Sequence, residues 1–184
     1  MRLSMPMPAA MSSMSASTVS ARLATALMKE IFFNKVRAAL WTLRGKRLAA
    51  LGLAFKGETD DIRDSPAVNM IEMLLDAGAI VTAFDPAAME RAKEVLPPEK
   101  NMRYASDLYE AAKDADAVLI LTDWKEFASI DLAQLNQVVR FPIVIDGRNL
   151  YKPQVMQDHG FTYVSVGRPA RYHEQQGKPR GPVV

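Results

Sequence analysis

Aromatic and cationic side chains follow several apolar runs of this 184-residue chain, at the points where those runs end. Phe55 and Lys56 come after the first run, Trp124 after a second and Arg148 after a third. A cation can neutralise a phosphate, Arg with two parallel hydrogen bonds, and an aromatic ring can contact a base or sugar face. Around one crevice, these residue types would suit a nucleotide diphosphate.

A predicted helix start lies shortly after Lys56 and favours the same kind of ligand. Ser65 is a predicted N-cap and Pro66 the first helical residue. The unpaired N–H groups of a helix start attract anions, and Arg63 adds a full positive charge beside them. The glycine fingerprint G-x-G-x-x-G is absent, because Gly52 is followed by Leu53-Ala54-Phe55. We therefore expect side chains, and not a bare glycine loop, to hold the ligand.

Several of these residues also have a purely structural interpretation. The charges between Lys56 and Asp64 can simply be solvated, and the acids among them can pair with Arg63 and Lys56 or cap the loop. Asp85 stands where a dinucleotide-binding fold holds the adenosine ribose, but it can instead cap the helix after Pro86. Trp124 can pack in the interior instead of contacting a ligand.

The order of predicted elements explains how these residues would meet. Short apolar strands alternate with helices, which predicts an α/β fold with a doubly wound, Rossmann-like parallel sheet in the order 3-2-1-4-5-6. The carboxyl ends of its central strands form the expected ligand crevice. The six predicted strands are Lys46–Leu53, Ile80–Phe84, Met102–Tyr104, Ala117–Leu121, Ile143–Ile145 and Tyr163–Val166. The predicted helices between them are Ala67–Ala77, Ala87–Leu96, Asp107–Ala112, Leu132–Val139 and Pro153–Asp158.

A long helix precedes this domain, with a helical apolar period from Val19 to Leu43 and a stop at Gly45. Its two apolar stripes predict two buried faces, one on the sheet and one on a second copy of the chain or another domain. The predicted organisation is a disordered segment over 1–18, a helix over 19–44, an α/β domain over 45–167 and a disordered tail over 168–184.

Composition narrows the function further. The chain has no Cys, which removes a thiol nucleophile and thiolate metal sites, and only two His, so no metal centre is expected. The net charge of +2 does not indicate a nucleic-acid surface, and no run of 18 apolar residues is present, so no membrane partner is expected. We expect a globular cytoplasmic protein.

One long motif carries a family resemblance. The pattern G-L-A-F-K-x-x-T-D-D-x-R-x-S-P from Gly52 to Pro66 resembles the opening of the C-terminal, UDP-binding domain of the UDP-glucose 6-dehydrogenase family. Further similar stretches are F-D-P, L-T-D-W-K-E-F, D-G-R-N-L-Y and G-F-x-Y-x-x-x-G-R, beginning at Phe84, Leu121, Asp146 and Gly160. K-V-x-x-A-L-W-x-L-x-G-K, beginning at Lys35, resembles the end of the helix through which that family dimerises.

The resemblance implies a role for several residues. Phe55, Lys56 and Arg148 match positions that bind the UDP-sugar, and Arg63 matches one that reaches NAD across an interdomain cleft. The family oxidises UDP-glucose to UDP-glucuronate with NAD through a catalytic Cys. This chain has no Cys and no glycine fingerprint, so the resemblance implies no catalytic residue here. We therefore expect the UDP-binding domain without the catalytic half of the enzyme, and we expect it to be inactive alone.

Three other interpretations stay open at this point. The chain could be a stand-alone module that binds UDP-sugars, or one that pairs with a copy of itself or with a complete dehydrogenase subunit through its first helix. It could also be the corresponding domain of an enzyme acting on UDP-N-acetylhexosamines.

Overall fold

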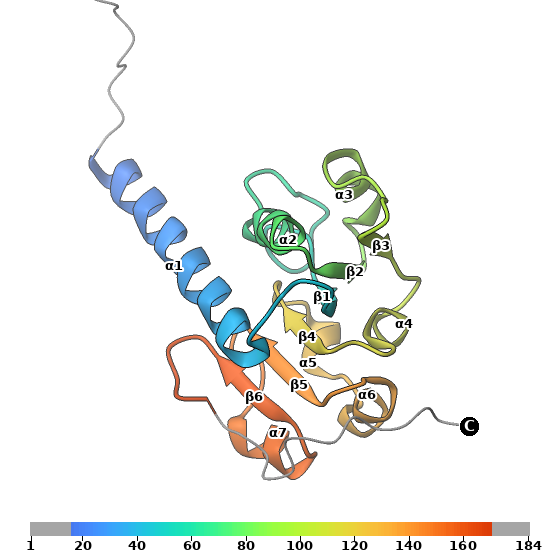
Figure 1. The fold of residues 1–184 in the computed structure, drawn as a ribbon. Coiled ribbons are helices and arrows are strands. Elements are labelled where there is room, and N and C mark those ends of the chain that lie inside the picture. Colours follow the sequence, from blue (N-terminus) through green and yellow to red (C-terminus); the bar gives the residue numbers. More distant parts are fainter. Residues whose placement is uncertain (1–15, 171–184) are drawn as a thin grey trace, which may run out of the picture.

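The structure is a computed structural model that describes residues 16–170, with side chains from residue 27 onward. It contains one sheet of six parallel strands in the order β3-β2-β1-β4-β5-β6, which confirms the predicted doubly wound α/β fold (Figure 1). The strands are β1 Arg47–Leu51, β2 Ile80–Phe84, β3 Met102–Tyr104, β4 Ala117–Ile120, β5 Ile143–Asp146 and β6 Thr162–Ser165.

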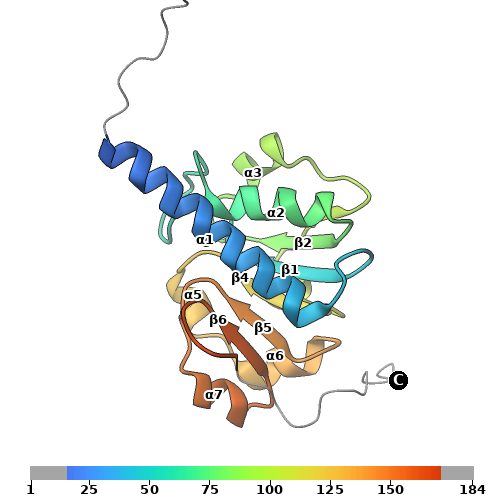
Figure 2. The same cartoon turned by 60° about the vertical axis from the view of Figure 1, so that its left-hand side comes forward.

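Helices cover the sheet, and local signals set where they start. They are α1 Ala16–Leu40, α2 Pro66–Asp76, α3 Met89–Val95, α4 Leu108–Ala112, α5 Lys125–Ala128, α6 Leu132–Val138 and α7 Pro153–Asp158. Ser65 caps α2, as predicted, by accepting the Ala67 N–H at 3.2 Å, and Asp131 caps α6 in the same way. Helices α1 and α2 lie side by side across one face of the sheet (Figure 2). The short helix α5 was not among the predicted elements.

The first helix ends earlier than its sequence pattern predicts. It stops at Leu40, not at Leu43, because Trp41 takes a left-handed backbone conformation with φ of 65°. The Trp41 N–H donates to the Arg37 carbonyl at 2.8 Å, a bond that closes the helix end. Residues 16–18, assigned to the disordered segment, are helical, while the rest of that segment and the tail from residue 171 lie outside the described residues.

One of the two predicted apolar stripes of α1 joins the main core. Phe32, Val36 and Leu40 are buried together with the central strands β1 and β4, whose residues are buried on both faces. The other predicted stripe, to which Leu27 belongs, is not buried in the same way, because Leu27 is 61% exposed. Only one face of α1 is therefore covered by the described part of this chain.

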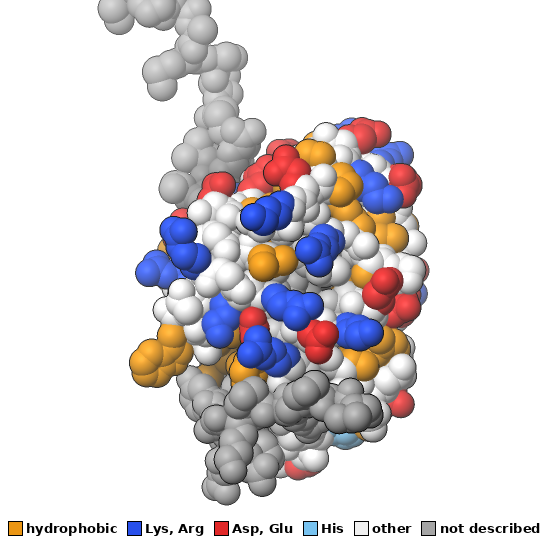
Figure 3. Space-filling model, turned by 45° about the vertical axis from the view of Figure 1, so that its right-hand side comes forward, with side chains coloured by type: hydrophobic (Ala, Val, Ile, Leu, Met, Phe, Trp, Pro, Cys, Tyr) orange, Lys and Arg blue, Asp and Glu red, His pale blue; other side chains and the backbone are white. Residues whose placement is uncertain are grey.

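Charged side chains cover much of the surface (Figure 3), and an exposed ion pair between them adds little stability. Lys and Arg side chains gather on the side of the molecule seen in Figure 3. The ion pair between Arg47 and Asp114 spans 4.0 Å between side chains that are 49% and 61% exposed, a type that adds at most about 1 kcal/mol. No helix within residues 16–170 has both the length and the apolarity to cross a membrane.

Candidate nucleotide site

Three neighbouring strands bring the predicted ligand residues to one edge of the sheet. Strands β1, β4 and β5 lie side by side, and Phe55, Asp123 and Arg148 follow them. Nη2 of Arg148 donates to the Phe55 carbonyl at 3.4 Å and pairs with Oδ1 of Asp123 at 3.5 Å. The structure therefore places Arg148 against the Phe55 backbone, although 93 residues separate them in the sequence.

The loop after β1 presents two side chains to solvent beside Arg148. The Phe55 side chain is 49% exposed, and within residues 27–170 nothing forms an ion pair or hydrogen bond with the Lys56 ammonium. The Phe55 N–H donates to the Asp61 carbonyl at 2.7 Å, which closes the loop on itself. A free cation and an exposed ring on a closed loop are available to a ligand.

Asp123 fixes the other side of this loop. Its Oδ1 accepts the Gly57 N–H at 3.2 Å, and a Cβ at Gly57 would lie 2.6 Å from the Asp123 carbonyl oxygen, so only glycine fits there. Partial burial opposes ionisation of the Asp123 carboxyl, but the Gly57 and Asp123 N–H groups and the Arg148 charge outweigh it and lower its pKa. The carboxylate is thus a stable anchor for both the loop and Arg148.

Asp146, the last residue of β5, holds the turn that carries Arg148. It is fully buried, and its Oδ1 accepts the Arg148 N–H at 2.8 Å. Its Oδ2 accepts the Leu150 N–H and the Tyr163 hydroxyl, each at 2.7 Å. Burial, together with the hydrogen bond and charge of Asp146, raises the pKa of Tyr163 well above its usual value, so that hydroxyl remains a donor. Sequence reasoning did not predict this structural role for Asp146.

Asp85 is a structural residue in this domain. Its buried carboxylate accepts the N–H groups of Leu53 at 2.7 Å and Ala54 at 3.1 Å through Oδ2, and those of Ala87 at 2.9 Å and Ala88 at 2.7 Å through Oδ1. It therefore caps the turn after Pro86, whereas α3 itself starts at Met89 without a side-chain cap. With both oxygens occupied, Asp85 cannot bind a ribose.

Trp124 takes the packing role and not the ligand role that sequence left open. The side chain is 8% exposed, and its indole N–H donates to Oδ2 of Asp85 at 3.1 Å. A ring so covered offers no face to a base. Phe55 is consequently the exposed aromatic side chain of this edge, within the residues that the structure describes.

The backbone groups of Leu53 and Ala54, at the start of the loop, are all engaged within the domain and cannot cradle a phosphate. The Ser65 hydroxyl donates to the Leu53 carbonyl at 2.7 Å, and the Thr122 hydroxyl donates to the Ala54 carbonyl at 2.9 Å. Their N–H groups are held by Asp85. This supports the expectation that side chains contact the ligand.

Arg63 occupies a separate part of the loop. Its guanidinium makes two bonds to Asp61, 3.0 Å from Nε to Oδ1 and 2.8 Å from Nη2 to Oδ2, and these bonds hold the pKa of Asp61 well below its ordinary value. Asp60 pairs with Arg91, not with Lys56. The Arg63 side chain is 86% exposed and pairs with Asp61, whereas Arg148 pairs with Asp123.

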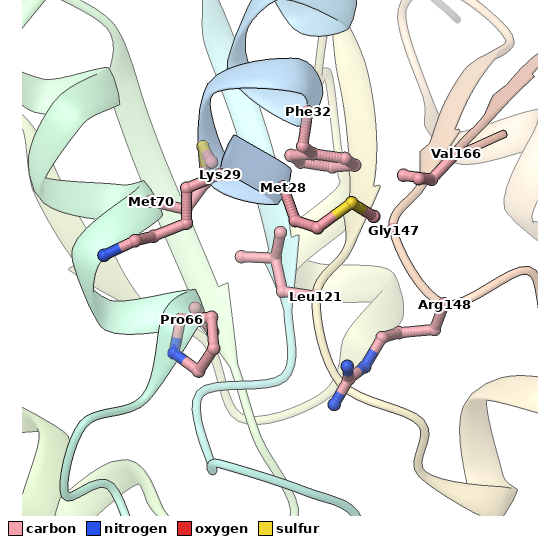
Figure 4. Close-up of a pocket in the computed structure, with 10 residues that line it drawn as sticks. Met28, Lys29, Phe32, Pro66, Met70, Leu121, Gly147, Arg148 and Val166 are labelled. Atoms are coloured by element: carbon pink, nitrogen blue, oxygen red, sulfur yellow. The ribbon is translucent and has the colours of Figure 1, made fainter. Parts of the chain in front are cut away.

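A pocket of about 350 Å³ lies next to Arg148, and helix α1 forms part of its wall. Met28, Lys29 and Phe32 come from α1, and Leu121 forms the floor (Figure 4). Sequence reasoning assigned this helix to packing and dimerisation and missed these residues, because nothing in the local pattern tells where a helix lies on a sheet. No group of three or more potential metal ligands lies together within the part of the chain described.

Residues 49–153 match the model of the UDP-glucose/GDP-mannose dehydrogenase family, UDP binding domain. The match covers more than half of the chain and includes all the residues that meet at the sheet edge. This chain belongs to that family. The resemblance noted in the sequence is thereby confirmed.

One similar protein sequence and one similar solved structure support the assignment to this family. The chain is 44% identical over 134 residues to a UDP-glucose 6-dehydrogenase of Rhizobium meliloti, covering 73% of this chain and 30% of that protein. A UDP-glucose dehydrogenase structure from Pyrobaculum islandicum superposes with a TM-score of 0.65 at 32% identity, over 74% of this chain and 30% of that one.

A second solved structure is also similar to this chain. It is the NDP-N-acetyl-D-galactosaminuronic acid dehydrogenase of Methanosarcina mazei, with a TM-score of 0.69 at 27% identity, over 91% of this chain and 34% of that one. The chain thus spans about a third of the length of these relatives.

Proposed function

We propose that this chain is the UDP-binding domain of an NAD-dependent UDP-glucose 6-dehydrogenase and that it binds the UDP part of the substrate at the carboxyl edge of its sheet. The observation that carries the proposal is the contact of Arg148 with the Phe55 carbonyl at 3.4 Å, which brings Arg148 to the loop that carries the exposed Phe55 ring and Lys56. That arrangement is complementary to a nucleoside diphosphate.

The proposed roles follow from the geometry of each side chain. Lys56 has no partner within the described residues and supplies one charge to the diphosphate. Arg148 supplies a second charge, and Asp123 and Asp146 fix its position. Phe55 lies against the sugar or base with its exposed face. The substrate would be UDP-glucose and the product UDP-glucuronate.

We propose that this domain does not hold NAD in its own crevice. The acid at the end of β2, Asp85, is buried with both oxygens occupied, and the loop after β1 carries no glycine fingerprint. We propose that Arg63, exposed on the outer part of the loop, contacts an NAD molecule held mainly by a separate domain. The chain alone contains no Cys and is proposed to be inactive.

The UDP-glucose branch is preferred over the N-acetylhexosamine branch on sequence identity. Among the solved structures, the chain shares 32% identity with the UDP-glucose dehydrogenase and 27% with the N-acetyl-D-galactosaminuronic acid enzyme. Leu27, 61% exposed on α1, gives a copy of this chain or a complete dehydrogenase subunit an apolar side chain to cover, so the proposal includes pairing through this helix.

Calorimetric titration with UDP-glucose, UDP and NAD tests the proposal. We expect UDP and UDP-glucose to bind with similar affinity and NAD not to bind. Lys56→Ala and Arg148→Ala should each weaken UDP binding by about 1.5–3 kcal/mol, since each removes a charged hydrogen-bond donor. Lys100→Ala, an exposed cation before β3, is the control. Binding of NAD alone, or unchanged UDP affinity in both variants, would place the ligand elsewhere.

A further inference from the structure

The amino edge of the sheet, opposite the proposed nucleotide site, carries a cluster of cations. Because all six strands are parallel, their starts lie together at this edge, away from Arg148. Five Lys and Arg side chains come from the starts of the strands or from segments next to them, and together they are called the basic edge: Lys46, Arg47, Arg103, Lys113 and Arg140. A partner bound here would leave the nucleotide site uncovered.

Direct contacts make these residues one cluster. Arg47, Arg103 and Lys113 line a hollow of about 20 Å³. The buried Asp116 connects this hollow to Arg140, because its Oδ2 accepts the Arg47 N–H at 2.8 Å and its Oδ1 lies 3.7 Å from Nη1 of Arg140. The negative charge of Asp116 is thus used inside the domain to hold two of the cations, and it is not exposed to a partner.

The aromatic ring of Phe141 lies beneath two of these cations. Nζ of Lys46 is 5.9 Å and Cζ of Arg140 is 5.3 Å from the centre of the ring. None of the large apolar side chains that are exposed within residues 27–170 belongs to the basic edge. The edge consequently offers charge and hydrogen-bond donors to a partner, and no exposed large apolar side chain that could enter a bilayer or stack on a base.

Positive charge is in excess at the basic edge. The Arg103 guanidinium makes no hydrogen bond or ion pair within residues 27–170. Arg47 pairs with Asp114 at 4.0 Å, but both side chains are exposed to water, which screens the pair. Within the described residues, the acids that pair with the basic edge are Asp114 and Asp116, so five cations face two carboxylates. The uncompensated charge attracts an anionic partner.

We propose that the basic edge binds an acidic segment of a partner protein, whose Asp or Glu side chains pair with Arg47, Arg103 and Arg140. Three of the five cations are Arg, whose guanidinium pairs with a carboxylate through two parallel hydrogen bonds. The hollow beside Arg47 has room for one water-sized group, and a carboxylate oxygen fits it. The distance from β3 to β5 is four strand spacings, or about 20 Å, so an extended segment of about six residues spans the edge.

An NMR titration of the full chain with a hexaglutamate peptide at low ionic strength tests this assignment. Arg103→Gln removes a guanidinium that makes no hydrogen bond or ion pair within the described residues, so the fold does not depend on it. Arg140→Gln removes a second cation of the edge. Arg91→Gln is the matched control, because Arg91 pairs with Asp60 at 3.0 Å beside the loop after β1. All three variants change the net charge equally, so a difference between them reports on the basic edge and not on overall charge.

We expect the peptide to shift the amide signals of Arg47, Arg103 and Arg140 and not that of Phe55. Arg103→Gln and Arg140→Gln should each weaken peptide binding about threefold or more, with Arg91→Gln within about twofold of the wild type. Absence of peptide binding, or an equal loss in all three variants, would overturn the inference.

Two further ligands separate the acidic protein segment from other anions. Tighter binding of inorganic polyphosphate, or of phosphatidylserine vesicles, than of hexaglutamate would also overturn the inference. Because the basic edge lies opposite the nucleotide site, Arg103→Gln should leave UDP binding unchanged. Failure of this inference therefore leaves the proposed function intact.

Discussion

At the scale of single residues, one carboxylate organises the loops that build the site. Asp85 accepts five hydrogen bonds, from backbone groups after β1 and β2 and from the Trp124 indole after β4. It therefore sets the path of Leu53 and Ala54 immediately before the proposed ligand residues Phe55 and Lys56. A position that binds ribose in dinucleotide folds is used here to hold the protein's own backbone.

The first prediction concerns this buried acid. Asp85→Ala should lower the free energy of unfolding by about 2–4 kcal/mol, because it leaves buried N–H donors without an acceptor. Trp124→Phe should cost about 1 kcal/mol, as it removes one of the five bonds. Asp131→Ala, an exposed cap of α6, is the comparison, at about 1 kcal/mol. Urea unfolding followed by circular dichroism measures all three. An Asp85 variant as stable as the Asp131 variant would contradict this account.

At the scale of elements, the end of β1 depends on a glycine that touches the neighbouring strand's loop. The strand stops at Leu51 and not at Leu53, because Gly52 has φ of 97°, a conformation that favours glycine. Its N–H donates to the Phe84 carbonyl at 2.8 Å, and a Cβ there would lie 2.4 Å from the Thr122 Cβ. The turn toward the ligand loop is thus possible only without a side chain.

Two glycine substitutions separate backbone conformation from close contact. Gly45→Ala should cost about 1 kcal/mol, since Gly45 has φ of 74° but no atom within 4 Å of a Cβ. Gly52→Ala should cost about 3 kcal/mol or more, because the same kind of backbone penalty is joined by a clash with Thr122. Thermal unfolding of both variants gives the difference. Equal losses would show that the contact with Thr122 does not matter.

At the scale of the whole molecule, α1 and the sheet form one structural unit. Phe32, Val36 and Leu40 belong to the same buried cluster as the residues of β1 and β4. A ring carbon of Phe32 lies 3.1 Å from where a Cβ of Gly147 would be, which brings α1 directly over the end of β5. The helix is therefore held in place over the pocket that it helps to line.

The third prediction tests whether this unit unfolds as a whole. Val36→Ala should lower the free energy of unfolding by about 1.5–3 kcal/mol, because a fully buried side chain loses two methyl groups. Unfolding should remain a single transition, seen alike by far-UV circular dichroism and by Trp fluorescence. Leu27→Ala, at a site 61% exposed, should stay within about 0.5 kcal/mol of the wild type. A separate early loss of helical signal would show that α1 unfolds independently.

The sequence by itself determined the α/β class, the six strands and their order, and the cap of α2 at Ser65. These features depend on interactions within a few residues, on apolar periodicity and on the regular crossing rules of parallel sheets. The motif beginning at Gly52 also indicated the family, since its many fixed positions are specific.

Only the tertiary structure decided what Asp85 and Trp124 do and where α1 lies. The Asp85 carboxylate and the Trp124 indole are 39 residues apart, and Arg148 and Phe55 are 93 apart. Whether such groups meet is set by the stacking of loops above neighbouring strands, which no local pattern records. The end of α1 at Leu40 was also not predictable from the sequence, since nothing in the residue type of Trp41 predicts a left-handed backbone. Local pattern fixes which elements form, and long-range packing fixes which side chains remain free for a ligand.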